Sequence, residues 1–85
     1  MPQLRLTPGY FRTAGRLAPV GSTTAVKLAR CLRSLQQEPV PGPDDAEDFL
    51  PPVKPCRARR VVGTALLVLF DRRADDVFVL AVRVG

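Results

Sequence analysis

The sequence has no histidine and no tryptophan, and it has only two cysteines and one tyrosine. Without histidine, the commonest general base at neutral pH is missing, and with it the catalytic triads and most transition-metal sites. Cys31 and Cys56 are too few for a disulfide scaffold or a zinc site, so we expect buried or half-buried thiols in a reducing, cytoplasmic setting. No residues have the spacing of metal ligands, so we expect neither a metal nor a cofactor.

Long apolar stretches are also missing. The longest, residues 61–70, is too short to cross a bilayer. The N-terminus has no basic segment followed by an apolar one, so no secretory signal is expected. With 85 residues and 46% hydrophobic content, the chain suffices for one domain, 1–85, with a single core.

Acidic residues are absent from positions 1–37, where six basic residues occur. Positions 38–50 reverse this with five acids and no base, and positions 51–70 carry four bases and no acid. All but two of the 13 basic residues are arginine, and the net charge is +5. Arginine suits the binding of phosphate or carboxylate, which makes nucleic acid, the ribosome or an acidic protein plausible partners. A GC-rich genome would give the same composition.

The N-terminal half predicts a strand and two helices. Gln3–Leu6 alternates polar and apolar residues, and Thr7-Pro8 is typical of a helix start, which predicts a helix over residues 9–18. Gly21-Ser22 predicts a turn and cap before a second helix, Thr23–Gln37. Its apolar residues recur every three or four positions: Ala25, Leu28, Ala29, Leu32 and Leu35. Lys27, Arg30 and Arg33 fall on the opposite side of this helix, either as a solvated face or as a partner-binding one.

The C-terminal half predicts strands after a proline-rich, acidic connection over residues 38–55, which we expect to be irregular. Cys56–Arg60 alternates, residues 65–70 are continuously apolar, and residues 77–84 are rich in β-branched side chains. A polar turn over residues 71–76 would join the last two strands as an antiparallel hairpin. Helices followed by such strands indicate an α+β fold.

The ordered set of segments resembles toxins of the RelE/ParE superfamily. The segments that carry the likeness are LRLTPGYFRTAGRL, AVKLARCLRSLQQEPVPGP and RARRVVGTALLVLF-DRRADD-VFVLAVRVG, nearly the whole chain. The resemblance implies a helical hairpin packed on a small twisted antiparallel sheet of three to four strands. It also implies the toxin role of a type II toxin–antitoxin system, with a cognate antitoxin as partner. The family's short C-terminal tail is not evident after the last strand.

Ribonuclease members of the family cut messenger RNA on the ribosome through basic residues on the sheet. The matching positions here are Lys54, Arg57 and Arg59, with Arg60 and Arg83 as further contacts. Arg57 and Arg59 are two residues apart, so they should project from one face of the sheet, outside the core. There they could bind phosphates and stabilise charge in the transition state. The alternative is an exposed face that pairs with Asp44–Asp48 of the same chain.

Several departures from the ribonuclease pattern leave the activity open. An arginine is expected early in the central strand, where this chain has Ala65, Leu66 and Leu67. The acid–base group expected after the last strand is also missing, and the single tyrosine, Tyr10, lies on the first helix. The chain could thus be an endoribonuclease, a non-catalytic inhibitor of DNA gyrase, or a degenerate toxin or basic module that only interacts with a partner. The target would be ribosome and mRNA, gyrase, or an acidic protein respectively.

Overall fold

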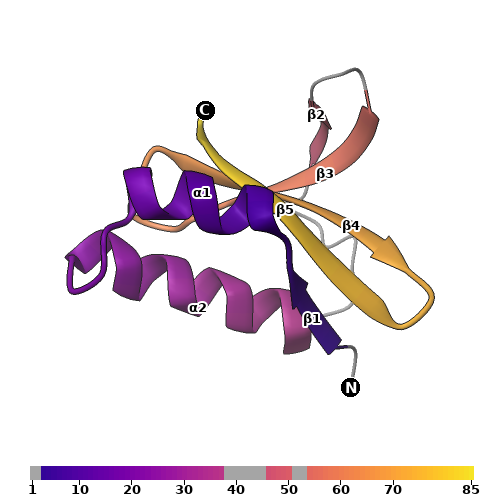
Figure 1. Cartoon of the computed structure of the whole chain (residues 1–85), viewed down its shortest axis with the longest axis horizontal. Coiled ribbons are helices and arrows are strands. Elements are labelled where there is room, and N and C mark those ends of the chain that lie inside the picture. Colours follow the sequence, from indigo (N-terminus) through magenta and orange to yellow (C-terminus); the bar gives the residue numbers. More distant parts are fainter. Residues whose placement is uncertain (1–2, 38–45, 51–53) are drawn as a thin grey trace.

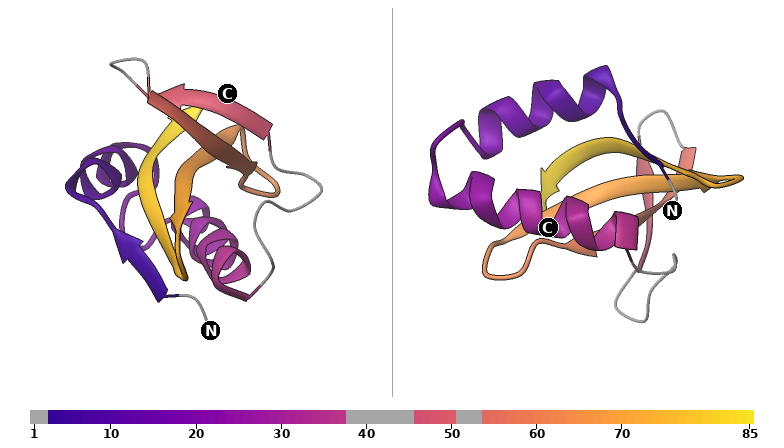
Figure 2. Two further views of the ribbon diagram at one scale, coloured as in Figure 1. Left: turned by 90° about the vertical axis from the view of Figure 1, so that its right-hand side faces the viewer. Right: turned by 90° about the horizontal axis from the view of Figure 1, so that it is seen from below.

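The structure, a computed structural model, describes residues 3–37, 46–50 and 54–85, with side chains described for 3–37 and 55–85. In these residues two helices pack on one curved sheet (Figures 1 and 2). The elements are β1 (Gln3–Leu6), α1 (Pro8–Leu17), α2 (Thr23–Gln37), β2 (Ala46–Leu50), β3 (Lys54–Arg60), β4 (Leu66–Arg73) and β5 (Asp76–Val84). The predicted α+β class is confirmed, and β1 and α2 have the predicted bounds.

The start of α1 is fixed by Thr7, as the sequence predicts. Its hydroxyl oxygen accepts a hydrogen bond from the Tyr10 amide at 3.3 Å, and Pro8 occupies the first turn, where no amide donor is needed. The same hydroxyl lies 2.7 Å from the carbonyl oxygen of Val79, to which it donates. The N-terminus of α1 is therefore joined to β5, and Figure 1 shows this helix lying across that strand.

Helix α2 begins after Ser22, whose hydroxyl oxygen accepts from the Ala25 amide at 3.1 Å. Its inward residues, Leu28, Cys31 and Leu35, are buried, whereas Arg30 and Arg33 are exposed. The predicted apolar face is therefore correct for Leu28 and Leu35, and Ala25 and Leu32 pack partly buried against the cluster. The prediction is wrong for Ala29, which is exposed.

The sheet has five strands in the order β1-β5-β4-β3-β2, rather than the three to four expected. It is also not wholly antiparallel, because β1 pairs parallel to β5. The fifth strand, β2, falls within the connection expected to be irregular and pairs with β3, Glu47 opposite Arg57. The sequence around β2 is rich in proline, which masked its strand character. Pairing with a strand already in the sheet supplies the hydrogen bonds that local propensity does not indicate.

Strands β4 and β5 form the predicted hairpin, but its turn is tighter than expected. The strands continue to Arg73 and resume at Asp76, so only Ala74 and Asp75 form the turn. Ala74 has φ of 54°. Such a left-handed conformation is typical of two-residue hairpin turns.

A β-bulge in this hairpin determines which way the end of β5 faces. Leu69 pairs with Ala81 and Phe70 pairs with Val79, so Leu80 is the extra residue. Before the bulge, Val77 and Val79 face the helices; after it, Val82 does. Because the alternation is shifted by one residue, Arg83 lies on the face away from the helices.

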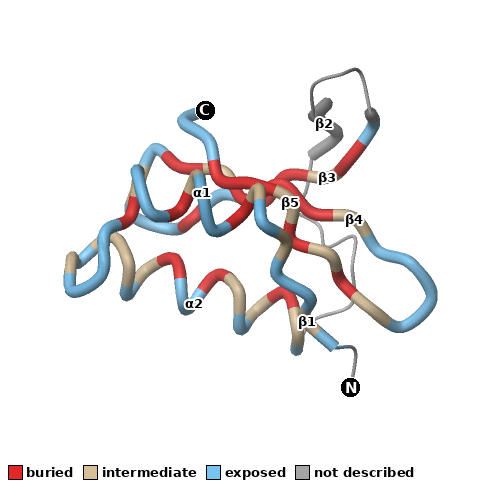
Figure 3. Tube along the Cα trace, viewed as in Figure 1, coloured by how far each residue is buried: buried red, intermediate tan, exposed pale blue. Residues whose placement is uncertain are grey.

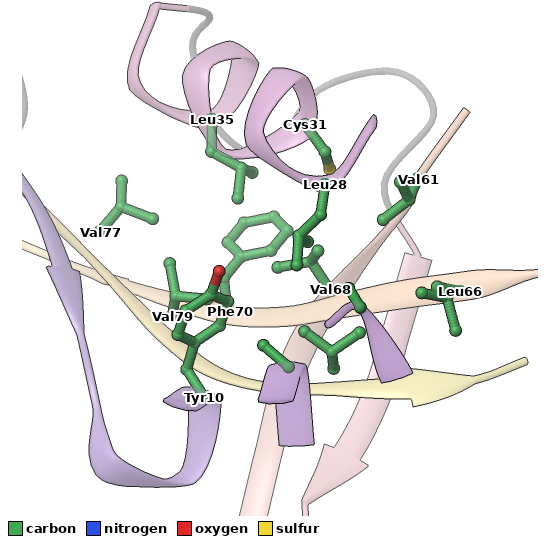
Figure 4. Packing of buried hydrophobic residues seen from close by; sticks show 13 residues of the cluster. Tyr10, Leu28, Cys31, Leu35, Val61, Leu66, Val68, Phe70, Val77 and Val79 are labelled. Carbon is green, nitrogen blue, oxygen red and sulfur yellow. The ribbon is translucent and has the colours of Figure 1, made fainter. Parts of the chain in front are cut away.

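Buried side chains form one cluster on each face of the sheet. Along the backbone, the buried residues lie in the middle of β3, β4 and β5 and at intervals along the two helices (Figure 3). The larger cluster lies between the helices and the sheet, where Phe70 and Leu35 are almost fully buried and Tyr10 reaches across from α1 (Figure 4). The smaller, on the other face, consists of Cys56, Ala58, Leu69 and Ala81, with Leu67 and Leu80 packed against it. Both cysteines are buried, as expected.

Candidate nucleic-acid interface

The arginines of β3 divide between the two faces of the sheet. Arg57 and Arg59 share the helix side, since they pair with Phe70 and Val68 of the larger cluster. The prediction that these two arginines share a face is therefore confirmed. Arg60, the next residue, points to the other side.

Arg59 is not outside the core, contrary to our expectation from the sequence. It is 8% exposed, its Nη1 donates to the Ser34 hydroxyl at 3.1 Å, and its Cζ lies 5.9 Å from the centre of the Phe70 ring. The reason is that α2 covers this side of β3. A guanidinium held in this way joins α2 to the sheet and is not accessible to a phosphate, whereas Arg57 is half-buried.

On the face away from the helices, Arg60 and Arg83 flank Leu67. The strand register pairs Arg60 of β3 with Leu67 of β4, and Leu67 with Arg83 of β5. The two arginines therefore stand about 10 Å apart, two strand spacings, on one face. Both are exposed. The Arg60 Nη1 donates to the main-chain oxygen of Gly85 at 3.0 Å.

Next to this arginine pair, the following row of the same face carries short or apolar side chains. Ala58, Leu69 and Ala81 form this row of the ladder, and all three are buried, so they are not themselves open to a ligand. Apolar packing beside two guanidiniums lowers the local dielectric constant, which strengthens their attraction for an anion.

Among the residues with described side chains, none next to Arg60 and Arg83 could serve as a general acid or base. Tyr10 lies in the core on the other side of the sheet, where burial, and secondarily Cys31, raise the pKa of its hydroxyl. The Asp71 carboxylate accepts a hydrogen bond from Arg73 Nε at 3.3 Å. No group of metal-binding side chains occurs within this part of the chain. The described geometry supports anion binding and electrostatic stabilisation.

The other expected contact residues lie elsewhere. Lys54 begins β3 opposite Leu50, but its side chain is outside the described residues, as are those of Asp44–Asp48, the alternative ion-pair partners. Lys27 Nζ donates to the Gly63 carbonyl at 3.2 Å and so holds the β3–β4 turn against α2. Arg30 and Arg33 are exposed on α2, on the helix side of the sheet. Arg60 faces the other side, so these arginines do not share a site with it.

The pairing of Arg60 with Arg83 was not found by sequence reasoning, which grouped Arg57 with Arg59. The alternation of side chains along β5 does not reveal this pairing. The bulge at Leu80 shifts the alternation by one residue, so residues after it face the side opposite to the one that the sequence pattern predicts. The only sequence signal is that both arginines lie near strand ends: Arg60 is the last residue of β3, and Arg83 is the next to last of β5. None of the described helices is long and apolar enough to cross a membrane.

Comparisons of the sequence with family models and with curated proteins give no match. The fold, in contrast, is similar to solved toxin structures. A copper-bound mutant toxin from Helicobacter pylori has a TM-score of 0.69 at 18% identity, covering 100% of this chain and 96% of that one. A metal-bound toxin from the same organism has a TM-score of 0.68 at 15% identity, with the same coverage.

A third similar structure comes from a different organism. The YoeB dimer from Staphylococcus aureus has a TM-score of 0.68 at 9% identity, covering 99% of this chain and 97% of that one. The match covers nearly the whole length of both chains in each case. The chain therefore has the same α+β fold as these solved structures.

Proposed function

We propose that this protein is the toxin of a type II toxin–antitoxin system and inhibits growth by cutting messenger RNA on the ribosome. Full-length similarity of the fold to toxins from two bacteria supports the toxin role. We propose RNA as the substrate because Arg60 and Arg83 lie on either side of Leu67 on one face, where both can contact a phosphate. Cytoplasmic location, a cognate antitoxin and the ribosome as partner follow from this proposal.

In the proposed reaction, the 2′-hydroxyl of the RNA attacks the adjacent phosphorus and a 2′,3′-cyclic phosphate forms as the bond from phosphorus to the 5′-oxygen of the next nucleotide breaks. Water takes the proton of the 2′-hydroxyl and protonates the leaving 5′-oxygen, so the protein supplies no nucleophile. Arg60 and Arg83 would hold the phosphate and stabilise the extra negative charge of the transition state, which is where such groups contribute most. The buried Arg59 would act indirectly by holding α2 against the sheet. Arg57 lies on the helix side of β3, the opposite face from this pair, and would not contact the same phosphate. Lys54 would add a positive charge at the start of the same strand.

The experiment is cleavage of a ribosome-bound message by the purified protein, read as RNA fragments. Each of Arg60→Gln and Arg83→Gln is expected to lower the cleavage rate by about 10²-fold or more, since one lost transition-state donor typically has that effect. Arg72→Gln and Arg73→Gln remove the same charge from the exposed end of the β4–β5 hairpin and should cleave like the natural protein. Thermal unfolding of each variant checks that the fold is retained.

A non-catalytic inhibitor of DNA gyrase is the second candidate. The observation in its favour is that the described side chains place no acid–base group next to Arg60 and Arg83. It predicts intact message and blocked supercoiling. Intact message with active supercoiling would leave only an interaction module and would reject both toxin mechanisms.

A further inference from the structure

The two helices carry a basic surface that the sheet site does not use. Residues 3–37 contain six basic residues and no acid. Arg5 forms an ion pair with Asp76, Nε to Oδ2 2.9 Å, and Lys27 is bonded to Gly63. The other four have no ion pair or hydrogen bond within the described part of the chain, and all four are exposed: Arg12, Arg16, Arg30 and Arg33.

An exposed aromatic ring precedes the first of these arginines on α1. Phe11 is 60% exposed, although it follows the buried Tyr10, whose ring it meets edge to face at 5.4 Å between centroids. A helix turns by 100° per residue, so Phe11 lies between the inward Tyr10 and the outward Arg12. Apart from Phe11, the only large exposed apolar side chain of the two helices is Val26. We call Phe11 and the four arginines the helical surface.

The positions of the four arginines match an extended polyanion. Arg12 and Arg16 are one turn apart on α1, about 6 Å along the axis, and Arg30 and Arg33 are about 4.5 Å apart on α2. Within each pair, guanidiniums at these intervals, with no carboxylate on α1 or α2, can contact successive phosphates of one strand.

We propose that the helical surface binds single-stranded nucleic acid, with a base stacked on Phe11 and phosphates held by the arginines. Basic residues with an aromatic ring among them are the combination that single strands require, because an unpaired base offers its face for stacking. A duplex would leave Phe11 without a partner. A protein interface requires a larger apolar centre than Phe11 and Val26 provide.

The test separates the stacking contact from the charge contacts. Fluorescent oligouridylate and oligothymidylate are titrated with the protein at several salt concentrations, and a hairpin duplex serves as the third probe. Phe11→Ala is expected to weaken single-strand binding by about 5- to 150-fold, the usual effect of one lost stacked base, with the salt dependence unchanged. Val62→Ala, an exposed apolar residue on the β3–β4 turn, is the matched control and should bind as the natural protein does.

The arginine variants, unlike the Phe11 variant, are expected to change the salt dependence of binding. The double variants Arg12→Gln/Arg16→Gln and Arg30→Gln/Arg33→Gln are each expected to lower the slope of log K against log salt by about 1.4, since each phosphate contact on a single strand contributes about 0.7. Arg72→Gln/Arg73→Gln removes equal charge beside Asp71 and Asp75 and should leave the slope unchanged. Comparison of the two oligonucleotides identifies RNA or DNA as the natural class.

The same titrations in an Arg60→Gln/Arg83→Gln background remove the sheet site, so the result does not depend on the proposed cleavage activity. Persistence of the Phe11 and arginine effects in that background supports a separate helical site. Equal binding by the helical variants and their controls would overturn the proposal. Displacement of the oligonucleotide by polyglutamate at equal charge concentration would also overturn it, in favour of an acidic protein partner.

Discussion

Replacing Gly9 with alanine tests the close packing of α1 against Leu80, the bulge residue that determines which way Arg83 faces. A Cβ at Gly9 would lie 2.7 Å from the Leu80 carbonyl oxygen, closer than carbon and oxygen can approach without movement. That oxygen is part of the main chain and also accepts from the Thr7 hydroxyl at 3.2 Å, so it has little freedom to move. The helix must shift, which breaks contacts of the larger cluster.

The expected magnitude follows from two opposing effects. Overpacking typically costs about 1–3 kcal/mol, and alanine gains up to about 1 kcal/mol over glycine from helix propensity. We therefore expect Gly9→Ala to lower the free energy of unfolding by about 1–2 kcal/mol. Gly15→Ala in the same helix is the matched control, because its Cβ would meet nothing within 4 Å. It should raise that free energy by about 0.5–1 kcal/mol.

The assay is thermal unfolding followed by circular dichroism. One kcal/mol corresponds to roughly 4–8 °C in a domain of this size, so the two variants should differ by roughly 6–24 °C in Tm. A shift of both variants in the same direction would refute the reasoning, because it would mean that α1 does not rest on Leu80. Cleavage activity of Gly9→Ala is expected to fall below that of Gly15→Ala, since Arg83 follows the bulge.

Two further predictions concern the core. Burial raises the pKa of Tyr10, so folding favours its neutral form: this stability is complete below the ordinary tyrosine pKa of about 10 and is lost as the pH rises toward the folded value. Tyr10→Phe should remove that alkaline loss, and tyrosinate absorbance reports this residue alone, because the chain has one tyrosine. Ser34→Ala removes the hydroxyl that accepts from the buried Arg59 guanidinium and should lower the urea-measured free energy of unfolding by about 1.5–3 kcal/mol. Loss of under 0.5 kcal/mol would show that Arg59 does not depend on Ser34.

The sequence by itself determined the elements whose signals are local. The Thr7-Pro8 start and the apolar spacing of Leu28, Cys31 and Leu35 specified both helices, because caps and helical periodicity act within a few residues. The two apolar runs at the C-terminal end likewise specified the β4–β5 hairpin. The side shared by Arg57 and Arg59 followed from the two-residue period of a strand.

The tertiary structure alone decided which arginines are accessible. Whether the side of β3 that carries Arg59 is open depends on α2, which is distant in sequence and covers it. The side on which Arg83 emerges depends on the bulge at Leu80, where α1 is also held by Thr7. The strand β2 exists through its pairing with β3. Burial, strand register and edge pairing depend on contacts between segments that are distant in the sequence. Local patterns of residues therefore do not predict them.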